Sequence, residues 1–256
     1  MSRSENVLDA SRDDLFDARL YRVMNARGIA GLGALVAKLK TASDPALDQE
    51  VVEAMTINET SFFRDRAAFE LLQNTLIPHL IESRSRERCL RFWSAACSSG
   101  QEAYSLAMLL RQNFPQIADW QIEICGTDIN MAMVRRARAG RYSRIEINRG
   151  LPARMLLKYF VRDGEEWELT SELRAICNFQ QCNLSHSLPI LARYDGILMR
   201  NVLFYFPEST QKRILQQVHR MLQKDGFLLL GSSEQAQPRD LWHPVFENNT
   251  CYYKRQ

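Results

Sequence analysis

The sequence predicts an α/β domain that follows a small all-helical unit and contains an insertion of short antiparallel strands. Three observations support this prediction. Apolar positions in residues 1–55 recur at helical spacing, strands alternate with helices after residue 85, and residues 141–182 break that alternation. Alternating strands and helices are typical of βαβ units around a parallel sheet.

The composition indicates a globular chain that is large enough to bury its own core. The 256 residues are 46% hydrophobic and 25% charged, with only 11 glycines and 8 prolines, which excludes a collagen-like or mainly disordered chain. The formal net charge is only +3, which is too balanced for the basic surface of a typical nucleic-acid binder. We therefore expect no nucleic-acid partner.

Apolar runs, cysteines and histidines limit the compartment and the cofactors. No run approaches the roughly 18 apolar residues of a membrane span, and the polar start MSRSENVLDASRDD lacks the apolar stretch of a secretory signal. We therefore expect a cytoplasmic protein without direct membrane insertion. The six cysteines form no CxxC pair and the four histidines show no metal-ligand spacing, which predicts reduced thiols and no bound metal.

The N-terminal helical unit is predicted from three amphipathic stretches. In the first, Phe16, Leu20 and Val23 recur at i, i+4 and i+7, which is the spacing of one helix face. Two further short helices are expected over 32–39 and 47–55. We place this helical domain at residues 1–60.

The α/β domain is predicted over residues 61–256, with its insertion at about 141–182. The insertion is expected to hold three short antiparallel strands, at 167–169, 172–175 and 176–181. The main strands are expected at five apolar runs: 90–96, 121–127, 194–199, 227–231 and 250–254. Between them, apolar residues at helical spacing predict helices around 106–114 and over 130–139 and 209–222.

The end of the first predicted strand is a candidate ligand site. In open α/β sheets, ligands bind at the carboxyl ends of the strands near the switch point. Here the strand is followed by Cys97-Ser98-Ser99-Gly100-Gln101-Glu102, whose small residues let a ligand approach the backbone and the N–H groups of the next helix. Neither GxGxxG nor GxxxxGK[ST] occurs, which disfavours a dinucleotide or a nucleoside triphosphate.

The second predicted strand ends in Gly126-Thr127-Asp128, and the carboxylate has two interpretations. Asp128 either caps the helix over 130–139 or binds ribose hydroxyls, as a carboxylate does at this position in related folds. Since the pyrophosphate motifs are absent, the second interpretation favours a nucleoside ligand such as S-adenosylmethionine.

Two further motifs place polar residues in apolar surroundings. Arg200 and Asn201 precede the apolar run 202–206, where they either face a site or mark an exposed strand end. The segment TINETSFFRD at 56–65 joins the two predicted domains, and domain junctions are favoured ligand sites. On composition alone, a helix cap with two core phenylalanines is the better explanation of this segment.

Together, these motifs resemble those of the chemotaxis receptor methyltransferase (CheR) family, from about residue 15 to the C-terminus. The matching segments are NETSFFRD at 58–65, CSSGQEAYSLA at 97–107, GTDIN at 126–130, Asn183-Leu184 and RNVLFYF at 200–206. The chain departs from the usual family pattern at Gln101, Ala103 and Met199. The resemblance implies a class I S-adenosylmethionine-dependent methyltransferase domain of Rossmann-like fold with a small antiparallel β subdomain, preceded by an all-α domain.

The resemblance also implies an activity. A protein-glutamate O-methyltransferase of this kind transfers a methyl group from S-adenosylmethionine to glutamate side chains of chemoreceptors, giving methyl esters for sensory adaptation and S-adenosylhomocysteine as the product. Its partner would be the cytoplasmic helical bundle of the receptors. Two alternatives stay open: a methyltransferase acting on another protein or a small carboxylate, and a non-catalytic S-adenosylmethionine sensor.

Residue roles follow from the matching positions. The resemblance implies that Arg64 and Tyr205 position the acceptor carboxylate. The implied cofactor-binding residues are Asn58, Thr60, Arg64, Glu102, Asp128, Asn183, Leu184, Arg200 and Asn201.

Two segments bear on receptor docking. Residues 18–43 contain five basic residues and no acidic one. A solvated helix face explains this pattern, but the resemblance implies that Arg19, Arg22 and Arg27 contact the acidic receptor bundle. The loop RDGEEW at 162–167 is shorter and more acidic than the glycine-rich loop with which some family members bind a receptor C-terminal pentapeptide. We therefore expect no such tether, and we expect a monomer.

Overall fold

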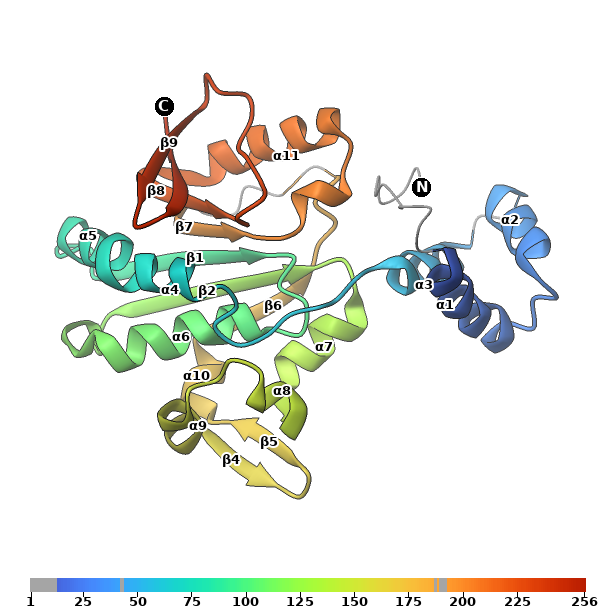
Figure 1. Ribbon diagram of the computed structural model, residues 1–256, viewed down its shortest axis with the longest axis horizontal. Coiled ribbons are helices and arrows are strands. Elements are labelled where there is room, and N and C mark those ends of the chain that lie inside the picture. The colour runs from blue at the N-terminus through green and yellow to red at the C-terminus, as the bar shows by residue number, and fades with distance from the viewer. Residues whose placement is uncertain (1–12, 42–43, 187, 189–192) are drawn as a thin grey trace. The chain divides into compact units, whose positions relative to one another are not determined.

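The computed structural model describes residues 13–41, 44–186, 188 and 193–256 (Figure 1). The chain divides into two compact units, the first ending at Asn58 and the second beginning at Glu59. The first unit contains α1 (Asp13–Ala26), α2 (Leu32–Thr41) and α3 (Pro45–Met55), which confirms the three predicted helices. Its core is formed by Met24, Ile29, Leu35 and Leu47.

The second unit is built on a seven-stranded sheet of order β6-β2-β1-β7-β8-β10-β9. Strands β6, β2, β1, β7 and β8 are parallel, and β10 and β9 are antiparallel additions at one edge. The order reverses between β1 and β7, and in open α/β sheets ligands bind at the carboxyl ends of the strands at such a point. The strands are β1 (Cys89–Ala95), β2 (Gln121–Asp128), β6 (Cys177–Gln181), β7 (Tyr194–Met199), β8 (Leu222–Leu230), β9 (Trp242–Glu247) and β10 (Thr250–Arg255).

Helices cover both faces of this sheet, as the predicted Rossmann-like fold requires. Because side chains alternate along a strand, neighbouring residues of β1 enter different cores: Phe92 packs with α4, α5 and α6, and Trp93 packs with α11. The helices of the first core are α4 (Arg66–Leu71), a π-helical turn at Leu72–Leu76, α5 (Ile77–Ser83), α6 (Gln101–Asn113) and α7 (Met131–Ala139). The helix of the second core is α11 (Glu208–Met221).

A three-stranded antiparallel sheet of order β3-β5-β4 forms the small β subdomain. Its elements are β3 (Arg141–Ser143), α8 (Arg144–Asn148), α9 (Ala153–Tyr159), β4 (Phe160–Asp163) and β5 (Glu166–Leu169), followed by α10 (Ser171–Ala175). Figure 1 shows β4 and β5 as a hairpin near α8 and α9. The Arg141 guanidinium binds carboxylates at 2.7 to 3.2 Å on both hairpin strands, namely Asp163, Glu166 and Glu168.

Of the three strands that we predicted in the insertion, the one at 167–169 lies in β5, and the one at 172–175 is wrong because these residues lie in the helix α10. The third is a strand, β6, but its predicted antiparallel place in the insertion is wrong, because β6 pairs in parallel with β2 at the edge of the main sheet. Phe179 on β6 is 1% exposed and packs against Tyr104 of α6. A short apolar run carries no information about which sheet it joins. The sequence pattern therefore could not predict that this strand joins the main sheet and contacts α6.

Strand β9 and the helical segment over 66–83 were not predicted from the sequence. Strand β9 contains Pro244, which argues against a central strand but is tolerated here because β9 is the edge strand of its sheet. The segment over 66–83 buries Leu72 and Ile77 completely against the sheet.

Arg84 follows α5 and binds two acidic residues at the amino end of the sheet. Its Nε donates to Asp195 Oδ1 at 2.7 Å, and its Nη1 and Nη2 donate to the two Asp225 oxygens at 2.7 and 2.5 Å. The Asp195 side chain is only 5% exposed, and it also accepts from the Arg91 backbone N–H. The hydrogen bond from Arg84 is the main cause that lowers the pKa of Asp225 from 3.8 to about 2.

We expect Arg84→Ala to lower the free energy of unfolding by about 3 kcal/mol at pH 7, because it leaves the buried Asp195 carboxylate without its cation. Urea unfolding measures this difference. Arg86→Ala, which removes an exposed arginine, is the matched control and should cost less than about 0.5 kcal/mol.

Wild type and Arg84→Ala together also test how the stability depends on pH. A lowered pKa in the folded state means that Asp225 stabilises the protein above its ordinary pKa of 3.8 and loses this effect as the pH falls towards about 2. The stability difference between wild type and Arg84→Ala should therefore shrink between pH 5 and pH 3. A constant difference over this interval would contradict the assignment.

Candidate functional site

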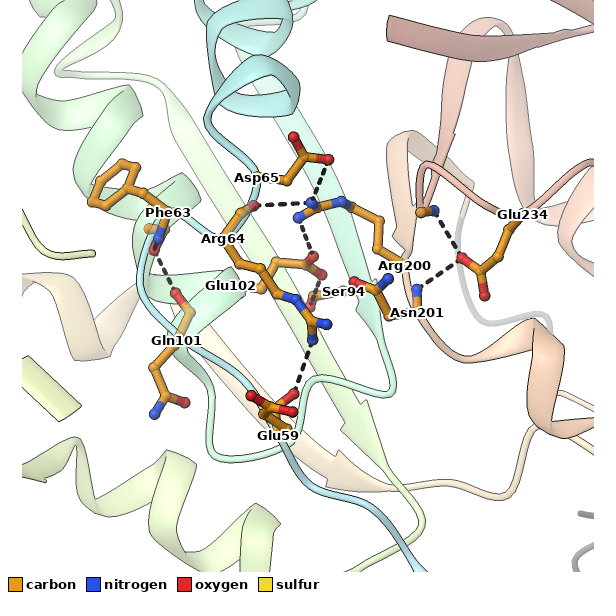
Figure 2. Close-up of polar contacts among 12 residues, drawn as sticks. Glu59, Phe63, Arg64, Asp65, Ser94, Gln101, Glu102, Arg200, Asn201 and Glu234 are labelled. Carbon is orange, nitrogen blue, oxygen red and sulfur yellow. Dashed lines mark hydrogen bonds and ion pairs between the residues drawn. The ribbon is translucent and has the colours of Figure 1, made fainter. Parts of the chain in front are cut away.

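Predicted site residues of the second unit meet at the carboxyl ends of β1, β2 and β7, where the strand order reverses. Glu102 is in the first turn of α6, Asp128 ends β2, and Arg200 and Asn201 follow β7. The segment 59–65, which precedes all of these residues in the sequence, reaches the same place. Figure 2 shows Arg64, Glu102 and Arg200 side by side.

The Arg200 guanidinium links three separate parts of the site. Its Nη1 donates to Glu102 Oε2 at 3.1 Å, and its Nη2 donates to the Arg64 carbonyl at 2.9 Å and to Asp65 Oδ2 at 3.2 Å. The Arg200 side chain is only 2% exposed. This interaction ties the end of β7 to α6 and to the segment 59–65.

Glu102 is also bound from the strand beneath it. Its Oε1 accepts from the Ser94 hydroxyl of β1 at 2.7 Å, so each of its oxygens has one partner within the protein. A carboxylate has about four lone-pair sites, and the Glu102 side chain is 14% exposed. The carboxylate can therefore accept further hydrogen bonds from a ligand.

The loop between β1 and α6 packs closely against α7 and is fixed to the end of β2. Gly100 begins α6 with φ +91°, and a Cβ there would lie 2.9 Å from the Ala137 Cβ. Glycine relieves both the conformational strain and the close contact. The backbone N–H of Ser98 donates to Asp128 Oδ2 at 2.8 Å, which fixes the loop to the end of β2.

Asp128 does not cap the next helix, so that interpretation is wrong. Asn130 is the N-cap of α7 and accepts from the N–H groups of Ala132 and Met133 at 2.9 and 3.3 Å. Asp128 accepts instead from the Ser98 and Asn130 N–H groups, and it is 6% exposed. The buried carboxylate thus stands at the junction of the two loops that border the crevice.

The segment 59–65 is held by an aromatic anchor and by its own turns. Phe62 is fully buried, with its ring centroid 4.9 Å from that of Tyr142. The Phe63 N–H donates to the Ser105 hydroxyl of α6 at 2.9 Å. The Arg64 Nη1 donates to the Glu59 carbonyl at 3.0 Å, and Thr60 lies half-buried between them in sequence. Asn58 belongs to the first unit, and its role in this site stays a prediction.

The remaining predicted residues lie in two other loops of the same unit. After β6, the Asn183 side-chain oxygen accepts from the N–H and hydroxyl of Ser185, and Leu184 is buried in the core that contains Trp93. After β7, Tyr205 ends the short 3-10 turn Leu203–Tyr205, with its ring 4.4 Å from that of Phe204.

Glu234, the fourth residue after β8, was not among the predicted site residues. It is 8% exposed, and its carboxylate accepts backbone hydrogen bonds from Asn201, Val202, Leu203 and Gly231. An acidic residue shortly after a strand end is the local signal that could have indicated it.

The three arginines predicted to contact a partner lie in the first unit and differ in their bonding. Arg27 binds Glu50 at 2.7 and 3.0 Å, and Arg19 donates to the Thr56 carbonyl at 2.5 Å. Arg22 is exposed on α1. Two of the three cations are therefore engaged within their own unit.

The site is suited to binding and positioning. Burial raises the pKa of the Cys97 thiol well above its ordinary value, so a thiolate nucleophile is disfavoured there. Within the described ranges, no three His, Cys, Asp or Glu residues are grouped as metal ligands, and no helix is long and apolar enough to cross a bilayer. All six cysteines are free thiols.

Comparison with known proteins gives consistent similarities. Residues 58–251 match the family model described as CheR methyltransferase, SAM binding domain. Chemotaxis protein methyltransferase 1 of Pseudomonas aeruginosa is 38% identical over 89% of this chain and 84% of its own. Chemotaxis protein methyltransferase 1 of Vibrio cholerae is 34% identical over 89% of this chain and 83% of its own. A TehB-like SAM-dependent methyltransferase structure from Corynebacterium glutamicum covers 74% of this chain and 88% of its own, at 12% identity and a TM-score of 0.41.

We expect Arg200→Met to release the segment 59–65, because the variant removes the donor to Arg64 and Asp65 and leaves Glu102 without its cation. The free energy of unfolding should fall by about 3 kcal/mol. Hydrogen exchange of amides in 59–65 should accelerate more than exchange in β2. Arg220→Met, at an exposed position of α11, is the control. Unchanged exchange in 59–65 would show that Arg200 does not hold this segment.

Proposed function

The chain belongs to the CheR methyltransferase family, and from that premise we propose that it transfers a methyl group from S-adenosylmethionine to glutamate side chains of chemoreceptors. The products would be glutamate methyl esters, which serve sensory adaptation, and S-adenosylhomocysteine. The observation that carries the proposal is the arrangement of Glu102, Asp128 and Arg200 at the switch point of the sheet.

The residues at the site fit S-adenosylmethionine. The buried Asp128 at the end of β2 would accept from ribose hydroxyls. Glu102, which retains acceptor capacity, would bind the methionine moiety. The N-terminus of α6, which follows the loop at Gly100, would offer backbone N–H groups to the cofactor. The other proposed contacts are Asn58, Thr60 and Arg64 near the sulfonium, Asn183 and Leu184 beside the adenine, and Arg200 and Asn201 on the floor of the site.

In this reaction, the main task of the protein is to orient the acceptor carboxylate. Bound S-adenosylmethionine supplies a methyl group on an activated sulfonium. A glutamate side chain has an ordinary pKa near 4.3 and is ionised at neutral pH, so no general base is needed. Orientation can contribute about 7–11 kcal/mol in favourable cases. We assign Arg64 and Tyr205 to this task, with Arg64 supported by the Glu59 carbonyl.

The first test is transfer of labelled methyl from S-adenosylmethionine to receptor-containing membranes, followed by mild base. We expect label released as methanol, because methyl esters are base-labile. Arg64→Ala should lower turnover at least tenfold, and an unchanged turnover would contradict the role assigned to Arg64. Base-stable label would exclude a carboxyl methyl ester. Cofactor binding without any receptor labelling would favour one of the alternatives, which are another protein or small carboxylate as acceptor, or a sensor.

Receptor docking through the first unit can be tested by charge reversal. Arg22 is exposed, whereas Arg27 is paired with Glu50. We therefore expect Arg22→Glu to raise the KM for receptor several-fold without changing cofactor affinity, and added salt to weaken wild-type receptor methylation in the same way. Lys224→Glu, an exposed charge reversal at the amino end of β8, is the control. Equal effects of the two variants would contradict docking at Arg22.

We infer that the β subdomain needs no receptor C-terminal pentapeptide. The β4–β5 connection is a two-residue turn at Gly164 and Glu165, and the acidic side chains beside it are paired with Arg141. Calorimetry with such a pentapeptide should show no binding, and tight binding would refute the inference. A monomeric, cytoplasmic enzyme is the accompanying expectation.

A further inference from the structure

Glu234 is a buried acidic residue beside the site, and the proposed function gives it no role. We propose that Glu234 is a positioning residue whose carboxylate holds the turn 201–205 in the conformation needed for methyl transfer. This turn carries Asn201 and Tyr205, so the inference rests on the proposed function and deepens it.

The Glu234 carboxylate is saturated with backbone donors. Its Oε2 accepts from the N–H groups of Asn201 at 2.7 Å and Gly231 at 2.8 Å. Its Oε1 accepts from Val202 at 2.8 Å and Leu203 at 2.7 Å. Hydrogen bonds to a carboxylate are stronger than neutral ones, and they compensate the burial of a group that is 8% exposed. Figure 2 shows this carboxylate facing the Asn201 backbone.

The turn that Glu234 holds has an unfavourable backbone without it. Asn201 has φ +58°, in the left-handed region that non-glycine residues rarely adopt. Val202 then starts the 3-10 turn Leu203–Tyr205, whose first N–H groups have no partners inside the turn. Glu234 accepts from three successive N–H groups, 201 to 203, and so provides the acceptors that the turn lacks.

A second observation shows that the surroundings are shaped around this carboxylate. The Glu234 N–H donates to the Gly231 carbonyl at 2.9 Å, which directs the chain after β8 back towards the turn. A Cβ at Gly231 would lie 2.6 Å from Glu234 Oε2 and 2.9 Å from Asn201 Nδ2. Gly231 therefore leaves the space in which the carboxylate and the turn meet.

The turn is fixed from two sides by different partners. Arg200 binds Glu102 and Asp65, whereas the N–H groups immediately after it bind Glu234. Loss of Glu234 would release the residues that lead to Tyr205 while the Arg200–Glu102 pair stays. The acceptor side of the site should therefore suffer more than the cofactor side.

The test is Glu234→Gln, which keeps the size of the side chain but turns an NH2 group towards backbone N–H donors. With saturating cofactor and receptor membranes, we expect kcat to fall at least tenfold. The Kd for S-adenosylhomocysteine, measured by calorimetry, should rise by a smaller factor than kcat falls, because Asn201 is the one proposed cofactor contact in the released turn. Hydrogen exchange of the amides 201–203 should accelerate relative to those of β1.

Two further variants separate positioning from general stability. Gly231→Ala retains Glu234 but crowds its carboxylate, so it should also lower kcat by a larger factor than it raises the Kd for S-adenosylhomocysteine. Asp225→Asn alters the far end of β8, where it weakens the ion pair with Arg84. Its kcat per folded molecule should equal that of wild type.

Wild-type kcat in both Glu234→Gln and Gly231→Ala would overturn the proposal. It would also be overturned if kcat and cofactor affinity fell together in proportion to the unfolded fraction, since that is a structural effect alone. Because exchange is measured without receptor, faster exchange at 201–203 would support Glu234 as the anchor of the turn even if wild type labelled no receptor. Absence of receptor labelling by the wild type would overturn the proposed function, but it would leave the role of Glu234 in holding the turn intact.

Discussion

The buried guanidinium of Arg200 is the interaction on which the site depends. A guanidinium presents its donors in a fixed planar fork, and here they reach the Glu102 carboxylate, the Asp65 carboxylate and the Arg64 carbonyl. These acceptors belong to α6 and to the segment 59–65, which are also joined by the hydrogen bond from the Phe63 N–H to the Ser105 hydroxyl. With the side chain 2% exposed, water cannot replace its partners, so the geometry of all three elements is set together.

A second arginine, the half-buried Arg84, holds the far end of the helical segment over 66–83. Arg200 binds the chain at residues 64 and 65, and Arg84 binds Asp195 and Asp225 at the amino end of the sheet, directly after α5. The helical segment between them buries Phe69, Leu72 and Ile77 against one face of the sheet. Ion pairs at both ends and an apolar face in the middle fix this short, interrupted pair of helices on the sheet.

Rigidity of this kind suits the proposed chemistry. An ionised acceptor and an activated methyl donor leave the protein with the tasks of alignment and exclusion of water. Most polar side chains at the site accordingly bind other parts of the protein: Asp128 holds the Ser98 loop, Ser94 and Arg200 orient Glu102, and Glu234 organises the turn after β7. Backbone N–H groups and buried carboxylates do this positioning. Burial raises the pKa of the Cys97 thiol in the same site.

The sequence by itself determined the elements that have a local period. The helical spacing in α1, α6 and α11 and the apolar runs of β1, β2 and β7 predicted these elements closely, and the strand-end motifs located Glu102, Asp128 and Arg200. Only the tertiary structure decided that residues 177–181 join the main sheet, that Asn130 rather than Asp128 caps α7, and that Glu234 binds the turn at 201–203. The physical reason is separation along the chain: Arg200 and Glu102 are 98 residues apart, and Glu234 and Asn201 are 33 apart. Contacts at such separations depend on how strands are ordered in the sheet, and no periodicity in the sequence records that order.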